Sequence, residues 1–128
     1  MKCNYTFLLI EDNAIDQLVT KQLLRKTIGV ETINVVDNGK DALQWITNNK
    51  EKLDNCLIIL LDINMPVMNG FQFLAEYEVL PDPVKKQTLI FMLSSTLNND
   101  DLDKIKKSNC VKTLLSKPLS IQKLMQFL

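Results

Sequence analysis

Residues 57–62 read Leu-Ile-Ile-Leu-Leu-Asp, five apolar residues without a break that end in a single carboxylate. Such a run is typical of a β-strand buried on both faces, because a strand with one wet face alternates apolar and polar residues. Residues 6–10, Thr-Phe-Leu-Leu-Ile, have the same character and lead directly into Glu11-Asp12-Asn13. Two such strands favour a parallel sheet that is covered on both sides.

Helix and strand patterns alternate along the rest of the chain. Apolar residues at helical spacing, with caps and breakers around them, predict helices at 14–28, 40–48, 70–77 and 100–107 and a last one after the cap Ser120, which carries Ile121, Leu124, Met125 and Leu128 on one face. Further strands are predicted at 32–36, 88–93 and 111–115. We therefore expect an α/β fold, a doubly wound five-stranded parallel sheet in one domain over residues 1–128.

The composition excludes several kinds of chemistry. The 128 residues hold 15 Lys plus Arg, 15 Asp plus Glu and no His, so neither a basic nucleic-acid surface nor a His-based catalytic or metal site is expected. The three cysteines have no metal-ligand or redox spacing and suit a reducing compartment. No signal peptide or membrane span is visible, so we expect a cytoplasmic protein without membrane contact.

Polar residues follow four of the five predicted strands. Glu11 and Asp12 follow the first and Asp62 ends the third, whereas Ser94, Ser95 and Lys117 close the fourth and fifth. Since ligands of doubly wound folds bind beyond the carboxyl ends of the strands, we expect these groups to share one crevice. Clustered carboxylates need a compensating positive charge such as a lysine or a hard divalent cation.

Taken singly, each of these residues has a plainer interpretation. Glu11-Asp12-Asn13 could cap a helix, and Asp62 could form an Asx turn. The serines could bond to the local backbone, and Lys117 before Pro118 could be a solvated lysine before a turn. Their joint occurrence at one edge of the predicted sheet is what favours a functional site.

Four segments together resemble the receiver domain of two-component response regulators. They are Phe7-Leu-Leu-Ile-Glu-Asp-Asn13, Leu61-Asp-Ile-Asn-Met-Pro-Val-Met-Asn-Gly70, Leu93-Ser-Ser95 and Ser116-Lys-Pro-Leu119. The resemblance covers essentially the whole chain and implies a flavodoxin-like (βα)5 receiver fold. It implies a stand-alone signalling protein without an effector domain, not an enzyme, which accepts a phosphoryl group from a histidine kinase or phosphotransfer protein and signals through contacts with a downstream protein.

The resemblance also implies a role for each site residue. Asp62 would be the phosphoacceptor, Lys117 would contact the phosphoryl group, and Ser94 would be the switch hydroxyl. Mg²⁺ would be held by Glu11, Asp12, Asp62 and the backbone carbonyl of Asn64. Pro118 matches a proline that is often cis in this family.

Two positions depart from the usual family pattern. Ser94 stands where Thr is commoner, and counting back from Lys117 would place the switch hydroxyl at Ser95 instead. Leu114 stands where an aromatic residue is usual, so coupling by an aromatic ring is not expected. The stretch 47–55 also looks extended.

Two other hypotheses compete with the receiver. A Mg²⁺-dependent phosphohydrolase with an aspartyl nucleophile would carry a second Asp two residues after Asp62, where this chain has Asn64. A pseudo-receiver that binds without phosphorylation would be expected to have lost part of the acid set, which is intact here.

Overall fold

The sheet of the computed structural model has five parallel strands, and the structure describes residues 6–27, 33–49, 57–65, 68–81, 88–95 and 99–128. The strand order is β2-β1-β3-β4-β5. The strands are β1 (Thr6–Ile10), β2 (Ile33–Val36), β3 (Leu57–Asp62), β4 (Thr88–Ser94) and β5 (Val111–Ser116). Every residue of β3 is buried, as the unbroken apolar run predicts for the central strand of a covered sheet.

Five helices alternate with these strands in the described ranges. They are α1 (Ala14–Thr27), α2 (Gly39–Asn49), α3 (Gly70–Glu78), α5 (Asn99–Lys107) and α6 (Ile121–Met125). The expected doubly wound α/β fold is therefore confirmed, with most element ends within one residue of their predicted places. Thr32, two of the three cysteines and most of the stretch 47–55 lie outside the described residues, while Cys110 lies within them and is half-buried.

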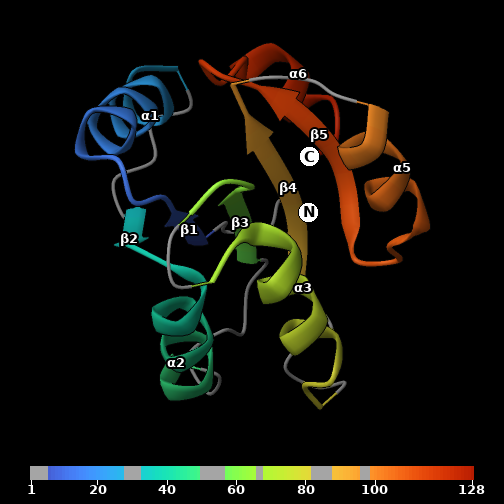
Figure 1. Cartoon of the computed structure of the whole chain (residues 1–128). Helices are drawn as coiled ribbons and strands as arrows, with labels where there is room; N and C mark the ends of the chain where they lie inside the picture. The colour runs from blue at the N-terminus through green and yellow to red at the C-terminus, as the bar shows by residue number, and fades with distance from the viewer. Residues whose placement is uncertain (1–5, 28–32, 50–56, 66–67, 82–87, 96–98) are drawn as a thin grey trace.

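The sheet separates two apolar cores (Figure 1). Helices α1 and α6 cover one face, where Phe7, Leu9, Ile58, Leu60, Phe91 and Leu93 form the α1–α6 core with helix residues such as Leu24 and Leu124. Helices α2, α3 and α5 cover the other face, where Leu8, Ile10, Ile59, Leu61, Ile90 and Met92 form the α2–α3–α5 core with residues such as Ile46 and Phe73. Trp45 of α2, the single tryptophan, is half-buried against this second core.

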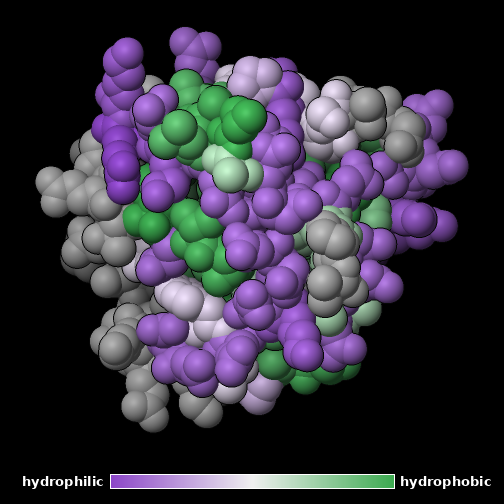
Figure 2. All heavy atoms as spheres, turned by 60° about the vertical axis from the view of Figure 1, so that its left-hand side comes forward, coloured by the Kyte–Doolittle hydropathy of each residue, from purple (hydrophilic) through white to green (hydrophobic). Residues whose placement is uncertain are grey.

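Helix α1 buries less of its apolar face than its sequence pattern suggests. Leu24 is fully buried, but Ile15, Leu18 and Val19 are 72%, 56% and 39% exposed. Thr20 is buried instead, at 6% exposure. Figure 2 shows hydrophobic surface gathered on the side of the molecule where α1 lies. The pattern therefore identifies the helix correctly but not the side that it buries.

The last helix is shorter than its sequence predicts. Ser120 caps it by accepting a hydrogen bond from the Lys123 N–H, and Ile121 and Leu124 are buried as expected. The helix ends at Met125, which is half exposed, and the following Phe127 packs edge-on against the Phe91 ring. None of the helices in the described ranges has the length and apolar character that a bilayer crossing requires.

Gly70, the first residue of α3, packs against the strand end that carries Asp62. Its N–H donates to the Ile63 carbonyl at 2.9 Å. The preceding residue, Asn69, caps the helix through a capping box with Gln72. A Cβ at Gly70 would lie 2.9 Å from the Asp62 carbonyl oxygen and 3.0 Å from the Ile63 Cα. Only glycine lets α3 begin this close to β3.

Gly70→Ala is expected to lower the free energy of unfolding by about 1–3 kcal/mol, because the added methyl group meets backbone that cannot rotate away. Urea denaturation followed by circular dichroism measures this loss. Gly39→Ala is the matched control at the start of another helix, where a Cβ first meets the flexible Met68 thioether. Equal losses in both variants would contradict the explanation.

Candidate functional site

Three carboxylates meet at the carboxyl edge of the sheet. Glu11 and Asp12 follow β1 and Asp62 ends β3, and one oxygen from each lies within 4.8 Å of the others. Glu11 and Asp62 are 1% and 4% exposed, whereas Asp12 is exposed. By strand alternation Glu11 and Asp62 continue the side of the sheet that faces the α1–α6 core. The structure thus brings together the acids that the sequence predicted would converge.

Backbone hydrogen bonds hold these strand ends in register. The Glu11 N–H donates to Val36 at 3.0 Å, the Lys117 N–H to Ser94 at 2.9 Å, and the Ile63 N–H to Leu93 at 3.1 Å. The Asn64 N–H also donates to Asp62 Oδ1, at 3.4 Å, so Asn64 lies in the turn that the acid begins. The acid and lysine positions therefore belong to the rigid sheet and not to separate loops.

Lys117 places its ammonium group among three carboxylates. Its Nζ lies 2.6 Å from Glu11 Oε1, 3.0 Å from Asp16 Oδ2 and 3.3 Å from Asp62 Oδ1. The Lys117 side chain is only 17% exposed. Burial by itself would lower the pKa of Lys117, but Glu11 and Asp16 outweigh it and hold the pKa above its usual value. The lysine stays charged and partly neutralises the acid cluster.

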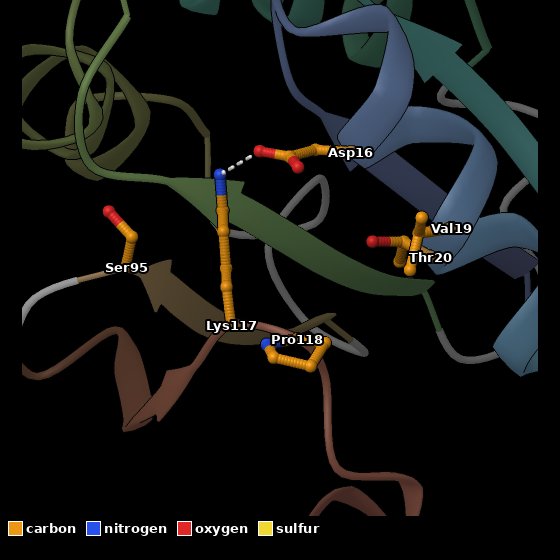
Figure 3. Close-up of a pocket in the computed structure, with 6 residues that line it drawn as sticks. All are labelled: Asp16, Val19, Thr20, Ser95, Lys117 and Pro118. Atoms are coloured by element: carbon orange, nitrogen blue, oxygen red, sulfur yellow. Dashed lines mark hydrogen bonds and ion pairs between the residues drawn. The ribbon is translucent and has the colours of Figure 1, made fainter.

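Asp16 is the one partner of Lys117 that the sequence did not reveal. It lies in the first turn of α1, where the Asn13 side chain caps the helix by accepting from the Ile15 and Asp16 N–H groups. An acid in a first helical turn is common because it interacts favourably with the helix dipole. The position of Asp16 in the sequence therefore did not mark it as a site residue. Figure 3 shows the Asp16 carboxylate meeting the Lys117 ammonium across the site.

A pocket of about 280 Å³ opens beside this ion pair. It is lined by Asp16, Val19, Thr20, Ser95, Lys117 and Pro118 (Figure 3). The Lys117–Pro118 peptide bond is cis, as the resemblance implies. The pocket therefore lies between α1 and the ends of β4 and β5.

Ser94 and Ser95 occupy different surroundings. Ser94 is fully buried at the end of β4, and strand alternation puts it on the face of the α2–α3–α5 core, against which Leu114 packs. Ser95 is exposed and lines the pocket next to Lys117. The structure therefore places both hydroxyls at the carboxyl edge, one inside and one at the surface.

The acid cluster shifts the titration of Glu11. Burial, reinforced by the neighbouring Asp62 and only partly offset by Lys117, raises its pKa from 4.5 to about 7. Glu11 Oε1 is buried, and the Lys117 ammonium approaches it outside hydrogen-bond geometry, so this oxygen has no directed donor among the described residues. In the metal-free protein the Glu11 carboxylate is thus an energetically costly charge.

The metal-free protein is expected to lose stability as the pH rises. The folded Glu11 carboxyl holds its proton more tightly than the unfolded one, so its stabilisation is complete below pH 4.5 and is lost as the pH passes through about 7. We expect the free energy of unfolding in urea with chelator to fall by roughly 1–3 kcal/mol between about pH 5 and about pH 8. Glu11→Gln removes the titrating group and should flatten this profile. An equally steep profile in Glu11→Gln would contradict the assignment.

The donor set fits a hard divalent cation. Mg²⁺ prefers carboxylate and carbonyl oxygens, and Glu11, Asp12 and Asp62 offer three oxygens that lie close together at an open edge. A buried Glu11 oxygen without a directed donor also lies in this cluster. The residues present therefore suit the cation that the resemblance implies.

The comparisons with known proteins agree with this geometry. The family model of the response regulator receiver domain matches residues 7–128. The crystal structure of a two-component response regulator from Cytophaga hutchinsonii superposes with a TM-score of 0.88 at 29% identity, covering 98% of this chain and 94% of that one. A response regulator receiver protein from Dyadobacter fermentans gives a TM-score of 0.88 at 27% identity, covering 97% of this chain and 94% of that one.

A curated relative matches a shorter part of the chain. A protein-glutamate methylesterase/protein-glutamine glutaminase of Desulfotalea psychrophila is 39% identical over 79 residues, which are 62% of this chain and 20% of that protein. The chain spans a fifth or less of the length of the first curated relatives that it matches.

Proposed function

Because the chain belongs to the family of response regulator receiver domains, we propose that it accepts a phosphoryl group on Asp62 from a phosphohistidine of a histidine kinase or phosphotransfer protein. The observation that carries this proposal is the position of Asp62. The Asp62 side chain is 6% exposed, and its carboxylate lies with Glu11 and Asp12 in one oxygen cluster, 3.3 Å from the Lys117 ammonium. A carboxylate nucleophile thus lies beside the cation that the transferred group requires.

The transfer exchanges one bond to phosphorus for another. An Asp62 carboxylate oxygen attacks the phosphorus, the new O–P bond forms, and the P–N bond to the donor imidazole breaks, with the leaving nitrogen taking up a proton. Lys117 then brings its ammonium to an oxygen of the transferred group, whose charge it neutralises. Hydrolysis removes the phosphoryl group again, because water attacks the phosphorus and Asp62 leaves as a carboxylate.

Glu11, Asp12, Asp62 and the Asn64 carbonyl are the groups that would hold Mg²⁺. When bound, the cation would neutralise charge on the phosphoryl oxygens and relieve the repulsion among the acids. Glu11 matters most on the protein side, because burial and the neighbouring Asp62 raise its pKa, and added positive charge would favour its carboxylate form.

Ser94 is the hydroxyl that we assign to signalling. It is buried at the end of β4 on the side of α5, so a movement toward new oxygens on Asp62 would shift the start of the β4–α5 connection. Half-buried Leu114 of β5 packs on the same face, and the output surface we propose is therefore α5 with β5, recognised by a downstream protein.

In the proposed role the protein is a phosphoacceptor and not an enzyme with a substrate of its own. Phosphotransfer to Asp62 and its hydrolysis are self-catalysed steps of a signalling protein, and we do not assign an enzyme activity toward a separate substrate. Partners are proteins and not nucleic acid or membrane, because the formal net charge is zero. A phosphohistidine donor of this kind suits the cytoplasm.

Acetyl phosphate, a small phosphodonor, tests this function without a partner. Incubated with it and Mg²⁺, the protein is expected to gain one phosphoryl group that is labile to acid and hydroxylamine, as an acyl phosphate is. Intact-mass spectrometry before and after hydroxylamine treatment measures the gain. If no group is incorporated, the proposal is wrong.

A Mg²⁺-dependent phosphohydrolase is the other activity that the same nucleophile could support. Asn64, two residues after Asp62, has no carboxyl to protonate a leaving group, which argues against it. Continuous release of phosphate from unrelated phosphoesters would identify the hydrolase. A receiver is expected to release phosphate only from the group that it has accepted on Asp62.

A further inference from the structure

Lys117 has one more carboxylate partner than phosphoryl transfer requires. Three carboxylate oxygens, from Glu11, Asp16 and Asp62, lie within 2.6 to 3.3 Å of Nζ, and Asp16 accepts a hydrogen bond from it. Glu11 and Asp62 come from the sheet, but Asp16 comes from α1. The lysine is therefore held from two structural layers.

Asp16 is fixed in place before any ligand arrives. The Asn13 side-chain oxygen accepts from the Asp16 N–H at 3.0 Å and from the Ile15 N–H at 2.9 Å, which sets the first turn of α1. The Asp16 side chain is 40% exposed and faces the pocket that Lys117 and Ser95 also line. Its carboxylate is thus more open to solvent than the Lys117 ammonium that it contacts.

We propose that Asp16 is a positioning residue that acts through Lys117: its carboxylate holds the ammonium on the α1 side and competes for it with the phosphoryl group arriving on Asp62. This inference rests on the proposed function. Lys117 cannot keep three carboxylate partners and also contact a phosphoryl oxygen, so one contact must weaken. Asp16 is the most exposed of the three partners, and its ion pair is the one that water can replace most easily.

Two effects then slow the acceptance of a phosphoryl group. The Asp16 bridge must open for Lys117 to move, and the Asp16 carboxylate repels an anionic phosphodonor that enters through the pocket. Asp16→Asn keeps the shape of the side chain and its capped helical turn while removing both effects. Asp16→Glu keeps the negative charge.

The contact itself is tested first, in protein free of metal and phosphodonor. An ammonium bound by three carboxylates exchanges its protons slowly and should give a lysine ¹⁵N–¹H NMR signal, assigned by its loss in Lys117→Arg. We expect the signal to weaken or disappear in Asp16→Asn and to persist in Asp100→Asn, a matched change in the first turn of α5. An unchanged signal in Asp16→Asn would overturn the proposal.

The competition is tested by the rate of phosphorylation with acetyl phosphate and Mg²⁺. Asp16→Asn is expected to react about 3- to 10-fold faster than the unchanged protein, in keeping with loss of a half-exposed ion pair and one local negative charge. Asp16→Glu should return most of the way to the original rate, and Asp100→Asn should leave it unchanged. An Asp16→Asn rate that is equal or slower would overturn the proposal.

The two measurements separate this inference from the function on which it rests. If the unchanged protein takes up no phosphoryl group, the proposed function fails, and the ammonium signal alone decides whether Asp16 holds Lys117. If the unchanged protein is phosphorylated and the ammonium signal is insensitive to Asp16, only the positioning role fails.

Discussion

Asp62→Asn is expected to abolish phosphoryl incorporation from acetyl phosphate, a loss of more than about 100-fold against the unchanged protein. Asn has no carboxylate oxygen that can attack phosphorus and form an acyl phosphate. Its side-chain oxygen can still accept from the Lys117 ammonium and the Asn64 N–H, which contact Asp62 Oδ1 at 3.3 and 3.4 Å. The change therefore removes the nucleophile with little effect on the surrounding contacts.

Stability distinguishes this loss from simple unfolding. Asp62 is one of the groups that raise the pKa of Glu11, so Asp62→Asn relieves repulsion within the cluster. At about pH 8 without metal, the variant is expected to be at least as stable in urea as the unchanged protein. Asp100→Asn, on the exposed start of α5, should keep full incorporation. An acid-labile, hydroxylamine-sensitive phosphoryl group on Asp62→Asn would show that the acceptor is another residue.

Lys117→Met is expected to slow phosphoryl incorporation by roughly 100- to 1,000-fold, the usual consequence of removing a charged group that stabilises a developing anion. Methionine keeps the apolar stem but leaves Glu11, Asp16 and Asp62 without their shared cation. Because Glu11 and Asp62 are buried, the metal-free protein should also lose about 3–5 kcal/mol of stability at about pH 8.

The loss of stability in Lys117→Met should depend on pH. At about pH 5 Glu11 is protonated in the folded protein, so it is no longer an uncompensated buried carboxylate and its part of the loss should disappear. Lys112→Met, at an exposed position of the same strand, is the control and should change neither the rate nor the stability by more than about 0.5 kcal/mol. A similar effect of both changes would mean that the Lys117 ammonium does not specifically assist phosphoryl transfer or stabilise the buried acids.

The sheet was predictable because strand burial is a strong local signal. An unbroken run such as 57–61 has no polar residue to face water, so only a central covered strand accommodates it. The functional edge followed from topology, since parallel strands end on the same side and each of four carried a polar residue there. Helix boundaries followed from caps such as Asn13 and Ser120, whose side chains make the expected hydrogen bonds.

Side-chain placement on the helices was not predictable to the same degree. Apolar spacing shows that 14–27 is a helix, but it does not show how far the helix sits over the edge of the sheet, and Ile15 and Leu18 prove exposed. The contact between Asp16 and Lys117 joins residues 101 positions apart, and it depends on the tilt of α1 against the β5 end. No local pattern encodes that tilt.

The position of Trp45 determines what its fluorescence can show. Because Trp45 is the single tryptophan, all tryptophan fluorescence of the chain comes from it. It is half-buried on α2, away from the cluster of Glu11, Asp12 and Asp62. Unfolding exposes the indole to water and should shift its emission to longer wavelength, so the signal follows the global transition. A change in emission when a ligand binds near Asp62 would instead mean that α2 has moved against the sheet. The protein therefore carries an intrinsic optical probe of that helix.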